Sequence, residues 1–165
     1  MEPHIITHTI APVYDHTSRV LLLGTMPSPK SRQAGFFYGH PQNRMWPVLA
    51  RIFGEPVPMG PDARRDFLLR HHIAMWDVLS ACTIRGADDS SIRDPVPNDL
   101  RPILDAAPIA AIFTTGKKAF ALYNRHIRPV TGRDAVCLPS TSPANCRYET
   151  MSTLTEAYRA LLEYL

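Results

Sequence analysis

The chain has 165 residues, of which 45% are hydrophobic and 20% charged, and its formal net charge is +3. This length and balance suit one folded domain spanning residues 1–165, and they argue against a disordered chain or a coiled coil. No apolar run approaches the roughly 20 residues of a membrane-spanning helix, and the opening residues lack the pattern of a secretory signal. We therefore expect a cytoplasmic protein, whose mild positive charge permits a polyanionic partner without requiring one.

The cysteines argue against two kinds of stabilising site, and the prolines mark the loops. Cys82, Cys137 and Cys146 are odd in number and too widely spaced for a CxxC pair, which argues against a disulfide framework and a structural zinc site. The 16 prolines are about twice the usual share of roughly 5%, and many of them gather at residues 27–47, 95–102 and 139–143. These stretches predict three rigid loops.

Four short apolar runs end in polar residues, glycine or proline, as is typical of strands buried on both faces. They cover residues 19–24, 73–77, 109–114 and 135–139. Helical periodicity falls between and after them, at residues 45–53, 62–71, 98–106, 119–127 and 153–165. Thr153 and Glu156 have capping-box spacing at the start of the last helix, and Asn98 or Asp99 could cap the third.

Alternating strands and helices predict an α/β fold with a parallel sheet covered on both faces. In such an open sheet the ligand binds beyond the carboxyl ends of the strands, so the segments that follow the apolar runs are where chemistry is expected. Four segments qualify, at residues 24–46, 82–98, 114–118 and 138–145.

The first segment carries three consecutive aromatic residues, 36–38, between two glycines. Such rings offer flat surfaces for stacking a base, beside polar side chains at positions 40, 42 and 43 that could hold a water or read ring edges. The alternative, that the rings only fill the end of the sheet, is slightly favoured by spacing alone. Asn43 could also cap a helix, although Pro47 would move that cap towards Trp46 and leave the Asn43 side chain free.

The second and third segments carry charged residues. Residues 82–98 are long enough for a functional loop, but Asp88 and Asp89 lack the further carboxylates that a hard cation needs, so we expect both to be solvated. Lys117 follows Gly116 at a helix start that could hold a phosphate, although the Walker A pattern is incomplete. Asp77, at the end of a predicted strand, could be a base or a loop anchor, and the anchor is favoured.

The fourth segment, residues 138–145, combines hydroxyl side chains and prolines without a charged residue. Its hydroxyl and N–H groups can bond phosphate oxygens, and a prolyl tip can enter a minor groove. Taken alone, the segment is more often an ordinary turn between a strand and a helix. A serine hydrolase is disfavoured, because no GxSxG elbow is present and no histidine follows Ser140 or Ser142.

Together these segments resemble the DNA-deoxyinosine (hypoxanthine-DNA) glycosylases, a branch of the uracil-DNA glycosylase superfamily. The resemblance spans about Val20 to Asn145 in the same order, and its most specific parts are GHPQNRMW at 39–46 and LPSTSPAN at 138–145. Further matching elements are GTMPS at 24–28, residues 89–99 and residues 114–120. The resemblance implies a three-layer α/β/α sandwich with a central four-stranded parallel sheet, no cofactor or metal, and hydrolysis of the bond between a flipped base and its sugar.

The resemblance also implies roles for single residues. Asn43 matches an asparagine held to be important in the deoxyinosine branch, where it would align the attacking water. Contacts to the base are implied for Gly24, Thr25, Met26, Pro27, Phe36, Phe37, Tyr38 and His40, with Phe37 preferred as the stacking ring. Contacts to DNA are implied for Ser28, Lys30, Lys117, Ser140, Thr141, Ser142, Pro143 and Asn145.

Two departures from the superfamily's patterns bear on the chemistry. Thr25 and Met26 stand where many relatives place an Asp or Asn that directs the water, and Leu138 stands where uracil-specific members keep a His or Asn. The departures therefore argue against strong uracil selectivity. The resemblance implies a monofunctional glycosylase of base-excision repair that acts on DNA containing deaminated bases, and we expect it to be a monomer. Hypoxanthine is the leading substrate and uracil a second candidate.

Three alternatives stay open. A mismatch-specific uracil-DNA glycosylase on the same fold would cleave deoxyuridine faster than deoxyinosine. A non-catalytic binder of damaged DNA is favoured by the missing acidic residue in the 24–28 motif, and Asn43→Ala tests the catalytic role by its effect on cleavage of both substrates. A small-nucleotide hydrolase would turn over free inosine and ignore DNA, and the residues of the 140–145 loop argue against it.

Overall fold

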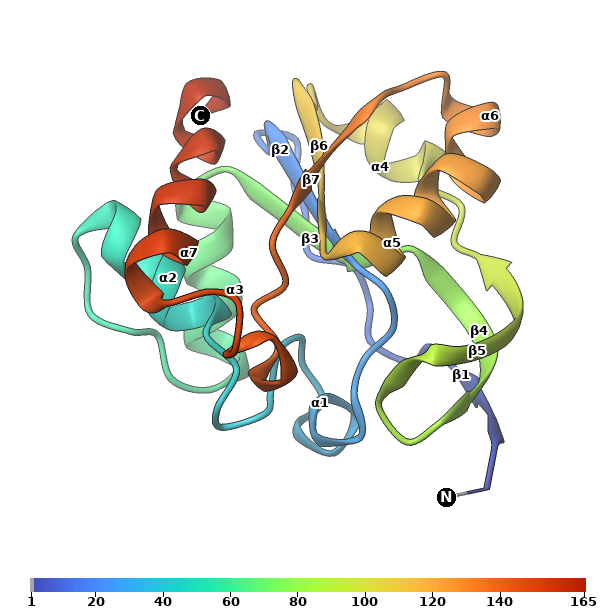
Figure 1. Cartoon of the computed structure of the whole chain (residues 1–165). Helices are drawn as coiled ribbons and strands as arrows, with labels where there is room; N and C mark the ends of the chain where they lie inside the picture. The colour runs from blue at the N-terminus through green and yellow to red at the C-terminus, as the bar shows by residue number, and fades with distance from the viewer. Residues whose placement is uncertain (1) are drawn as a thin grey trace.

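A four-stranded parallel sheet forms the centre of the computed structural model, which describes residues 2–165 (Figure 1). Its strands are β2 (Val20–Gly24), β3 (Ile73–Asp77), β6 (Ala111–Thr115) and β7 (Ala135–Leu138). They lie in the order β3-β2-β6-β7, and Leu22 of β2 is in register with Met75 of β3 and Phe113 of β6. The prediction of four strands in one parallel sheet is confirmed.

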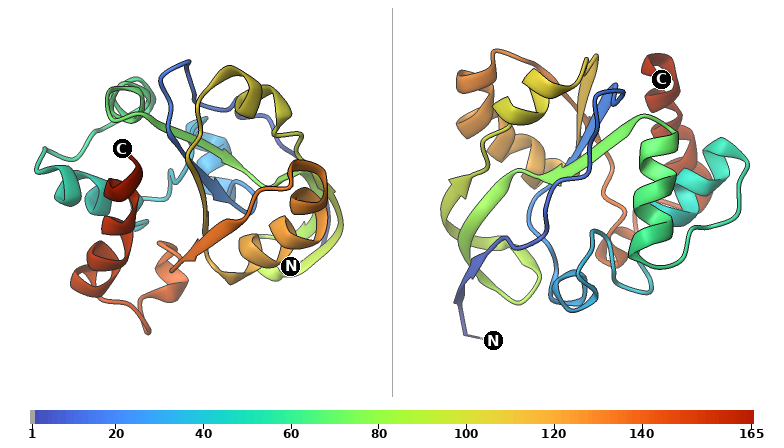
Figure 2. Two further views of the ribbon diagram at one scale, coloured as in Figure 1. Left: turned by 90° about the horizontal axis from the view of Figure 1, so that it is seen from above. Right: turned by 180° about the vertical axis from the view of Figure 1, so that it is seen from behind.

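Helices cover both faces of this sheet, as Figures 1 and 2 show. One layer contains α2 (Met45–Phe53), α3 (Pro61–Arg70), α7 (Met151–Tyr158) and the 3-10 helix η3 (Arg159–Tyr164). The other layer contains α4 (Arg101–Ala106), α5 (Lys117–Leu122), the π-helix η1 (Tyr123–Ile127) and α6 (Arg128–Thr131). The expected α/β/α arrangement is therefore confirmed.

The central strand β2 explains why the sequence needs an unbroken apolar run at this point. All of its residues are buried, and successive side chains of a strand point to opposite faces. Val20 and Leu22 therefore pack in the core beneath α2 and α7, whereas Leu21 and Leu23 pack in the core on the α4 and α5 side. Packing on each face buries apolar surface, which stabilises the fold by roughly 25 cal/mol for each Å² removed from water.

A second, antiparallel sheet was not predicted. It contains β1 (His4–Thr7), β4 (Leu79–Arg85) and β5 (Asp88–Pro97) in the order β1-β4-β5. Most of residues 82–98, expected as a loop, therefore form a hairpin. The ladder between β4 and β5 has three register shifts, which disrupt the strict alternation by which strands are recognised in a sequence.

The helix α4 begins at Arg101, whereas the sequence predicts a start at Asn98. The buried side-chain amide of Asn98 instead donates hydrogen bonds to the backbone carbonyls of Asp77 and Leu79, at 2.9 and 3.1 Å. Asp99 accepts a hydrogen bond from the N–H of Arg101 through Oδ1. Asn98 thus fixes the chain at the end of β3, where the candidate site lies.

The capping box of α7 also differs from the prediction, which paired Thr153 with Glu156. Thr150 Oγ1 accepts a hydrogen bond from the N–H of Thr153, and Thr153 Oγ1 accepts one from the N–H of Thr150. The hydroxyl group of Thr153 takes the position that Glu or Gln usually occupies in a capping box. The usual sequence pattern, Ser or Thr followed three residues later by Glu or Gln, therefore places the box three residues too late in the chain.

None of the helices in residues 2–165 is long and apolar enough to cross a membrane.

Candidate active site

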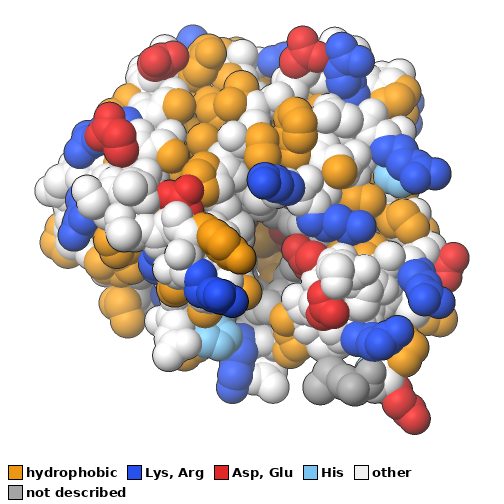
Figure 3. All heavy atoms as spheres, in the orientation of Figure 1, with side chains coloured by type: hydrophobic (Ala, Val, Ile, Leu, Met, Phe, Trp, Pro, Cys, Tyr) orange, Lys and Arg blue, Asp and Glu red, His pale blue; other side chains and the backbone are white. Residues whose placement is uncertain are grey.

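A cavity of about 310 Å³ opens at the carboxyl ends of the parallel strands. Its walls come from the turn after β2, from residues 37–43, from the ends of β3 and β6, from the tip of the β4-β5 hairpin and from the loop after β7. Figure 1 shows these segments gathered below the sheet, around the short helix α1 (Pro29–Ala34). On the surface, Figure 3 shows a hollow near the centre of this face, with Lys and Arg side chains around it and acidic side chains beside it.

The structure brings most of the predicted site residues to this cavity. Those that line it are Gly24, Thr25, Met26, Pro27, Ser28, Phe37, Tyr38, His40, Asn43, Ser140, Thr141, Ser142 and Pro143. Four others lie outside its lining, namely Phe36, Lys30, Lys117 and Asn145. Phe36 is 1% exposed and meets Phe37 edge to face, with ring centroids 5.4 Å apart, so it supports the wall from behind.

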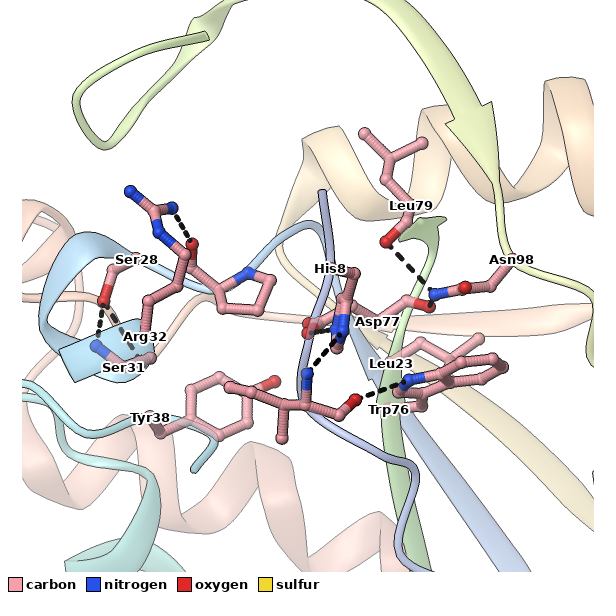
Figure 4. Close-up of polar contacts among 12 residues, drawn as sticks. His8, Leu23, Ser28, Ser31, Arg32, Tyr38, Trp76, Asp77, Leu79 and Asn98 are labelled. Carbon is pink, nitrogen blue, oxygen red and sulfur yellow. Dashed lines mark hydrogen bonds and ion pairs between the residues drawn. The ribbon is translucent and has the colours of Figure 1, made fainter. Parts of the chain in front are cut away.

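The turn after β2 is held by its own side chains. Ser28 caps α1, because its Oγ accepts a hydrogen bond from the N–H of Ser31 at 3.1 Å. Arg32 donates a hydrogen bond to the carbonyl of Pro27 at 2.9 Å. Figure 4 shows both contacts beside the cavity. These hydrogen bonds hold the turn in place as one wall of the cavity. Neither Thr25 nor Met26 in this turn has a side-chain carboxylate or amide that could direct a water.

Tyr38 places its hydroxyl group at the floor of the cavity. Its backbone is left-handed, with φ of 51°, and its hydroxyl oxygen lies 2.9 Å from Oγ1 of Thr115. Oγ1 of Thr115 also lies 3.4 Å from the carbonyl oxygen of Leu23, so the Tyr38 hydroxyl group contacts the ends of both β6 and β2. Burial raises the pKa of Tyr38 far above its ordinary range, so the phenol stays neutral.

Asn43 lines the cavity, and its side chain also bonds to the first residue of α2. Its Oδ1 accepts a hydrogen bond from the N–H of Met45 at 2.9 Å, and Arg44 occupies the N-cap position. The expectation that the cap would move to Trp46 and leave the side chain of Asn43 free is therefore wrong. The bond orients the amide, and its NH₂ group bonds to no acceptor among residues 2–165.

The loop after β7 is built as a turn and also lines the cavity. Ser140 Oγ accepts a hydrogen bond from the N–H of Ser142, and Ser142 caps the 3-10 helix η2 (Pro143–Asn145). The amide of Asn145 donates to the carbonyl of Ser140. The carbonyl of Thr141 accepts a hydrogen bond from the N–H of Arg44, which joins this loop to the GHPQNRMW segment.

Asp77 lines the cavity and forms a buried pair with His8, which lies outside the lining (Figure 4). Nε2 of His8 is 2.7 Å from Oδ2 of Asp77, and the two side chains are only 3% and 5% exposed. Burial raises the pKa of the Asp77 carboxyl group, and the hydrogen bond from His8 opposes part of that rise. Sequence reasoning missed His8 altogether, because its only signal is a lone histidine far along the chain from any motif.

Gly24 is the residue that allows this end of the cavity to exist. A Cβ atom there would lie 2.5 Å from Oδ1 of Asp77 and 2.9 Å from the hydroxyl oxygen of Tyr38. Both distances are shorter than ordinary van der Waals contact, so any side chain at position 24 would displace one of these groups. The glycine is needed for close approach and not for an unusual backbone angle.

Asp89, at the tip of the hairpin, faces the mouth of the cavity, whereas Asp88 accepts hydrogen bonds from Ser90 outside it. Desolvation raises the pKa of Asp89, and a hydrogen bond with Thr25 opposes the rise. Both residues are exposed, as expected for solvated carboxylates, and Asp89 also lines the cavity. Among residues 2–165, no group of three or more His, Cys, Asp or Glu side chains is placed to hold a metal ion.

Comparison with known proteins gives consistent results. Residues 11–165 match the family model of the uracil DNA glycosylase superfamily. Proteins named hypoxanthine DNA glycosylase from Methanosarcina barkeri and Methanosarcina acetivorans are 33% and 32% identical over 138 residues, which cover 82% of this chain and 86% of each relative. A solution NMR structure from Methanosarcina acetivorans, described as a candidate uracil DNA glycosylase, matches with a TM-score of 0.79 at 29% identity, covering 96% of this chain and 99% of that one.

Proposed function

The chain belongs to the uracil DNA glycosylase superfamily and is a DNA glycosylase, and we propose that the base it removes is hypoxanthine. The reaction would hydrolyse the bond between a flipped deaminated base and its deoxyribose and leave an abasic site. The observation that carries this proposal is one cavity in which an aromatic ring, an oriented amide and two loops converge, in a chain 33% identical to a hypoxanthine DNA glycosylase.

Access to the cavity requires the target nucleotide to leave the duplex. Extrusion costs a few kcal/mol and is least costly for a mispaired base, and deamination creates such bases. Phe37 supplies an apolar wall against which the base can rest, and the loop with Ser140 and Pro143 stands at the rim, where it can meet the phosphate backbone and the minor groove. Lys30 and Lys117 are exposed outside the cavity and are proposed to contact phosphates.

Cleavage of the bond produces positive charge on the sugar and negative charge on the departing base. Catalysis therefore depends on donors near the base and on a positioned water more than on a strong nucleophile. An amide cannot hold a proton, so Asn43 is proposed to align the water. The N–H groups of Met26 and Tyr38 have no acceptor among the described residues and are candidates for stabilising the departing base.

A cleavage assay tests this proposal. Duplexes with a single deoxyinosine or a single deoxyuridine are incubated with the protein in the presence of a metal chelator, and alkali-labile breaks are resolved on a gel. The proposal predicts breaks in both or in the deoxyinosine duplex alone, with the higher rate on deoxyinosine. A higher rate on deoxyuridine would favour the uracil-specific alternative, and tight binding without breaks would favour the non-catalytic binder.

A further inference from the structure

Arg44 bonds to both ends of the loop that connects the rim of the cavity to α7 (Figure 1). Its backbone N–H group donates a hydrogen bond to the carbonyl of Thr141 at 3.1 Å. Its Nη1 donates a hydrogen bond to the carbonyl of Glu149 at 2.5 Å. These two carbonyls bracket residues 141–149, so one residue of the GHPQNRMW segment fixes the two ends of the loop relative to each other.

The guanidinium group of Arg44 is not free to bind DNA itself. Its Nε and Nη2 atoms are buried, and its Nη1 is bonded to Glu149. Arg44 also lies outside the lining of the cavity. Any effect of this side chain on DNA must therefore pass through the loop that it holds.

Stability alone gives no reason for an arginine at this position. Nε and Nη2 carry most of the N–H groups of the guanidinium, and they have no hydrogen-bond acceptor among residues 2–165. A buried charge with unmade hydrogen bonds costs free energy, and a well-packed apolar side chain in its place is often neutral or stabilising. The arginine is explained if the loop must be held in one conformation.

The residues between the two carbonyls are those that the proposed function brings to DNA. Ser142 and Pro143 line the cavity at its rim. Beyond them Arg147 is exposed, and the side chain of Tyr148 is 76% exposed, so this part of the loop is open to a partner. A loop that is already ordered loses less conformational entropy on binding, and holding it therefore increases the affinity for DNA.

We propose that Arg44 is a positioning residue for DNA binding, which holds residues 141–149 in the conformation that meets the phosphate backbone. The inference rests on the proposed function, because it requires this loop to contact DNA. It also separates two neighbours in the chain. Asn43 lines the cavity and is proposed to align the water, whereas Arg44 acts on the loop, so their loss should affect different steps.

The substitution Arg44→Met tests the inference, because it removes the donor to Glu149 and keeps a long, unbranched side chain. Affinity is measured for a duplex with tetrahydrofuran in place of one nucleoside, which offers no base and cannot be cleaved. The single-turnover rate is measured on a deoxyinosine duplex at saturating protein. We expect the affinity to fall about tenfold and the saturated rate to stay within about twofold. The melting temperature should fall by no more than about 3 °C.

Two comparisons make this result specific to the loop. Asn43→Ala should show the opposite pattern, with a slower saturated rate and an affinity within about threefold of wild type. Arg133→Met is the matched control, because Arg133 is also half-buried and donates to a backbone carbonyl, that of Ile109, at 2.6 Å. Both of these residues precede strands of the parallel sheet, at the end opposite the cavity. This variant loses the same charge and should keep its affinity within about twofold.

Salt dependence and a conservative variant distinguish positioning from direct contact. The slope of log Kd against log salt concentration should be the same for wild type and Arg44→Met, whereas loss of an arginine bound to a phosphate would reduce the slope by about one. In Arg44→Lys the ammonium group can still donate to the carbonyl of Glu149. It should restore the affinity to within about threefold of wild type.

The inference is overturned if Arg44→Met binds the tetrahydrofuran duplex as tightly as wild type, if its salt slope falls by about one, or if Arg44→Lys binds as weakly as Arg44→Met. Should Arg44→Met fail to fold, Arg44→Gln decides, because its polar side chain is too short to reach Glu149. It should lose about tenfold in affinity, and wild-type affinity would overturn the inference. Wild-type protein that binds the tetrahydrofuran duplex but leaves deoxyinosine DNA intact would instead contradict the proposed function.

Discussion

His8 and Asp77 are 69 positions apart in the chain, yet Nε2 of one lies 2.7 Å from Oδ2 of the other in the interior of the protein. The contact joins the segment after β1 to the carboxyl end of β3, so the antiparallel sheet and the parallel sheet meet at the cavity. The small sheet therefore contributes to the site as well as covering it.

Substitution of Asn43 by Ala should reduce the single-turnover rate of base removal by about 10²- to 10³-fold, the usual effect of removing one positioned polar group. Because Oδ1 also accepts the hydrogen bond of the first N–H group of α2, the variant should lose about 1 kcal/mol of unfolding free energy. Asn124→Ala, at an exposed position on η1, serves as the control for both measurements. A rate equal to that of wild type would remove Asn43 from the mechanism.

Gly24→Ala should lower both base removal and stability, because its methyl group meets Asp77 and Tyr38 at sub-van der Waals distances. We expect a loss of about 1–3 kcal/mol in a urea titration and at least a tenfold lower rate. Gly54→Ala is the comparison, since it introduces backbone strain at φ of 65° but meets no atom within 4 Å. It should lose stability and keep its rate, and equal rates in the two variants would contradict the prediction.

The stability of the protein should depend on pH through Asp77. A carboxyl group whose pKa is raised in the fold disfavours its charged form there, so burial of Asp77 opposes folding at neutral pH and this penalty fades as the pH falls through the folded-state pKa. The groups that face it are His8, Tyr38 and Asp89. Asp77→Asn should therefore raise the melting temperature at pH 7.5 and raise it less at pH 4.5.

Thermal unfolding of the two proteins at the two pH values measures this difference directly. Asp99→Asn is the control, because its pKa is lowered by Arg101, so its contribution to stability has the opposite sign. A gain for Asp77→Asn that is larger at pH 4.5 would contradict the sign of the effect. The expected result would mean that the protein gives up stability to keep a buried carboxyl group in its site.

Thr150→Ala should destabilise α7 by about 1 kcal/mol, because it removes the acceptor of the capping box. Glu156→Ala is the matched control, since Glu156 is the residue that the sequence pattern wrongly placed in the box and its one ion pair, with Arg159, is exposed. Chemical denaturation should show a larger loss for Thr150→Ala. Equal losses of stability in the two variants would contradict this assignment and favour the predicted box of Thr153 and Glu156.

The parallel sheet was predictable because burial on both faces demands contiguous apolar residues. The runs at 19–24 and 73–77 satisfy that demand and end in turns, and the observed strands differ from them by at most one residue at each end. The β4-β5 hairpin was not predictable in the same way. It has an exposed face, shifted pairing and the prolines Pro95 and Pro97, so it resembles a loop in sequence.

The site was predictable only where its residues lie in motifs. The turn after β2, Asn43 and the loop after β7 are short, rigid segments of unusual composition, and each lines the cavity. His8 and Thr115 act through tertiary contacts, with Asp77 and Tyr38, that no local pattern encodes. Phe36 lies in a motif and has an aromatic ring that could stack on a base. It nevertheless packs behind Phe37 and does not line the cavity.

The central claim, that this DNA glycosylase removes hypoxanthine, is tested most directly by identifying the released base. A duplex with one deoxyinosine is incubated with excess protein and a metal chelator, and free bases are quantified by mass spectrometry beside the abasic sites formed. The account predicts hypoxanthine and abasic sites in equal amounts, with a rate above that of uracil release from the matched deoxyuridine duplex. Release of uracil alone, or bound duplex without any free base, would contradict it.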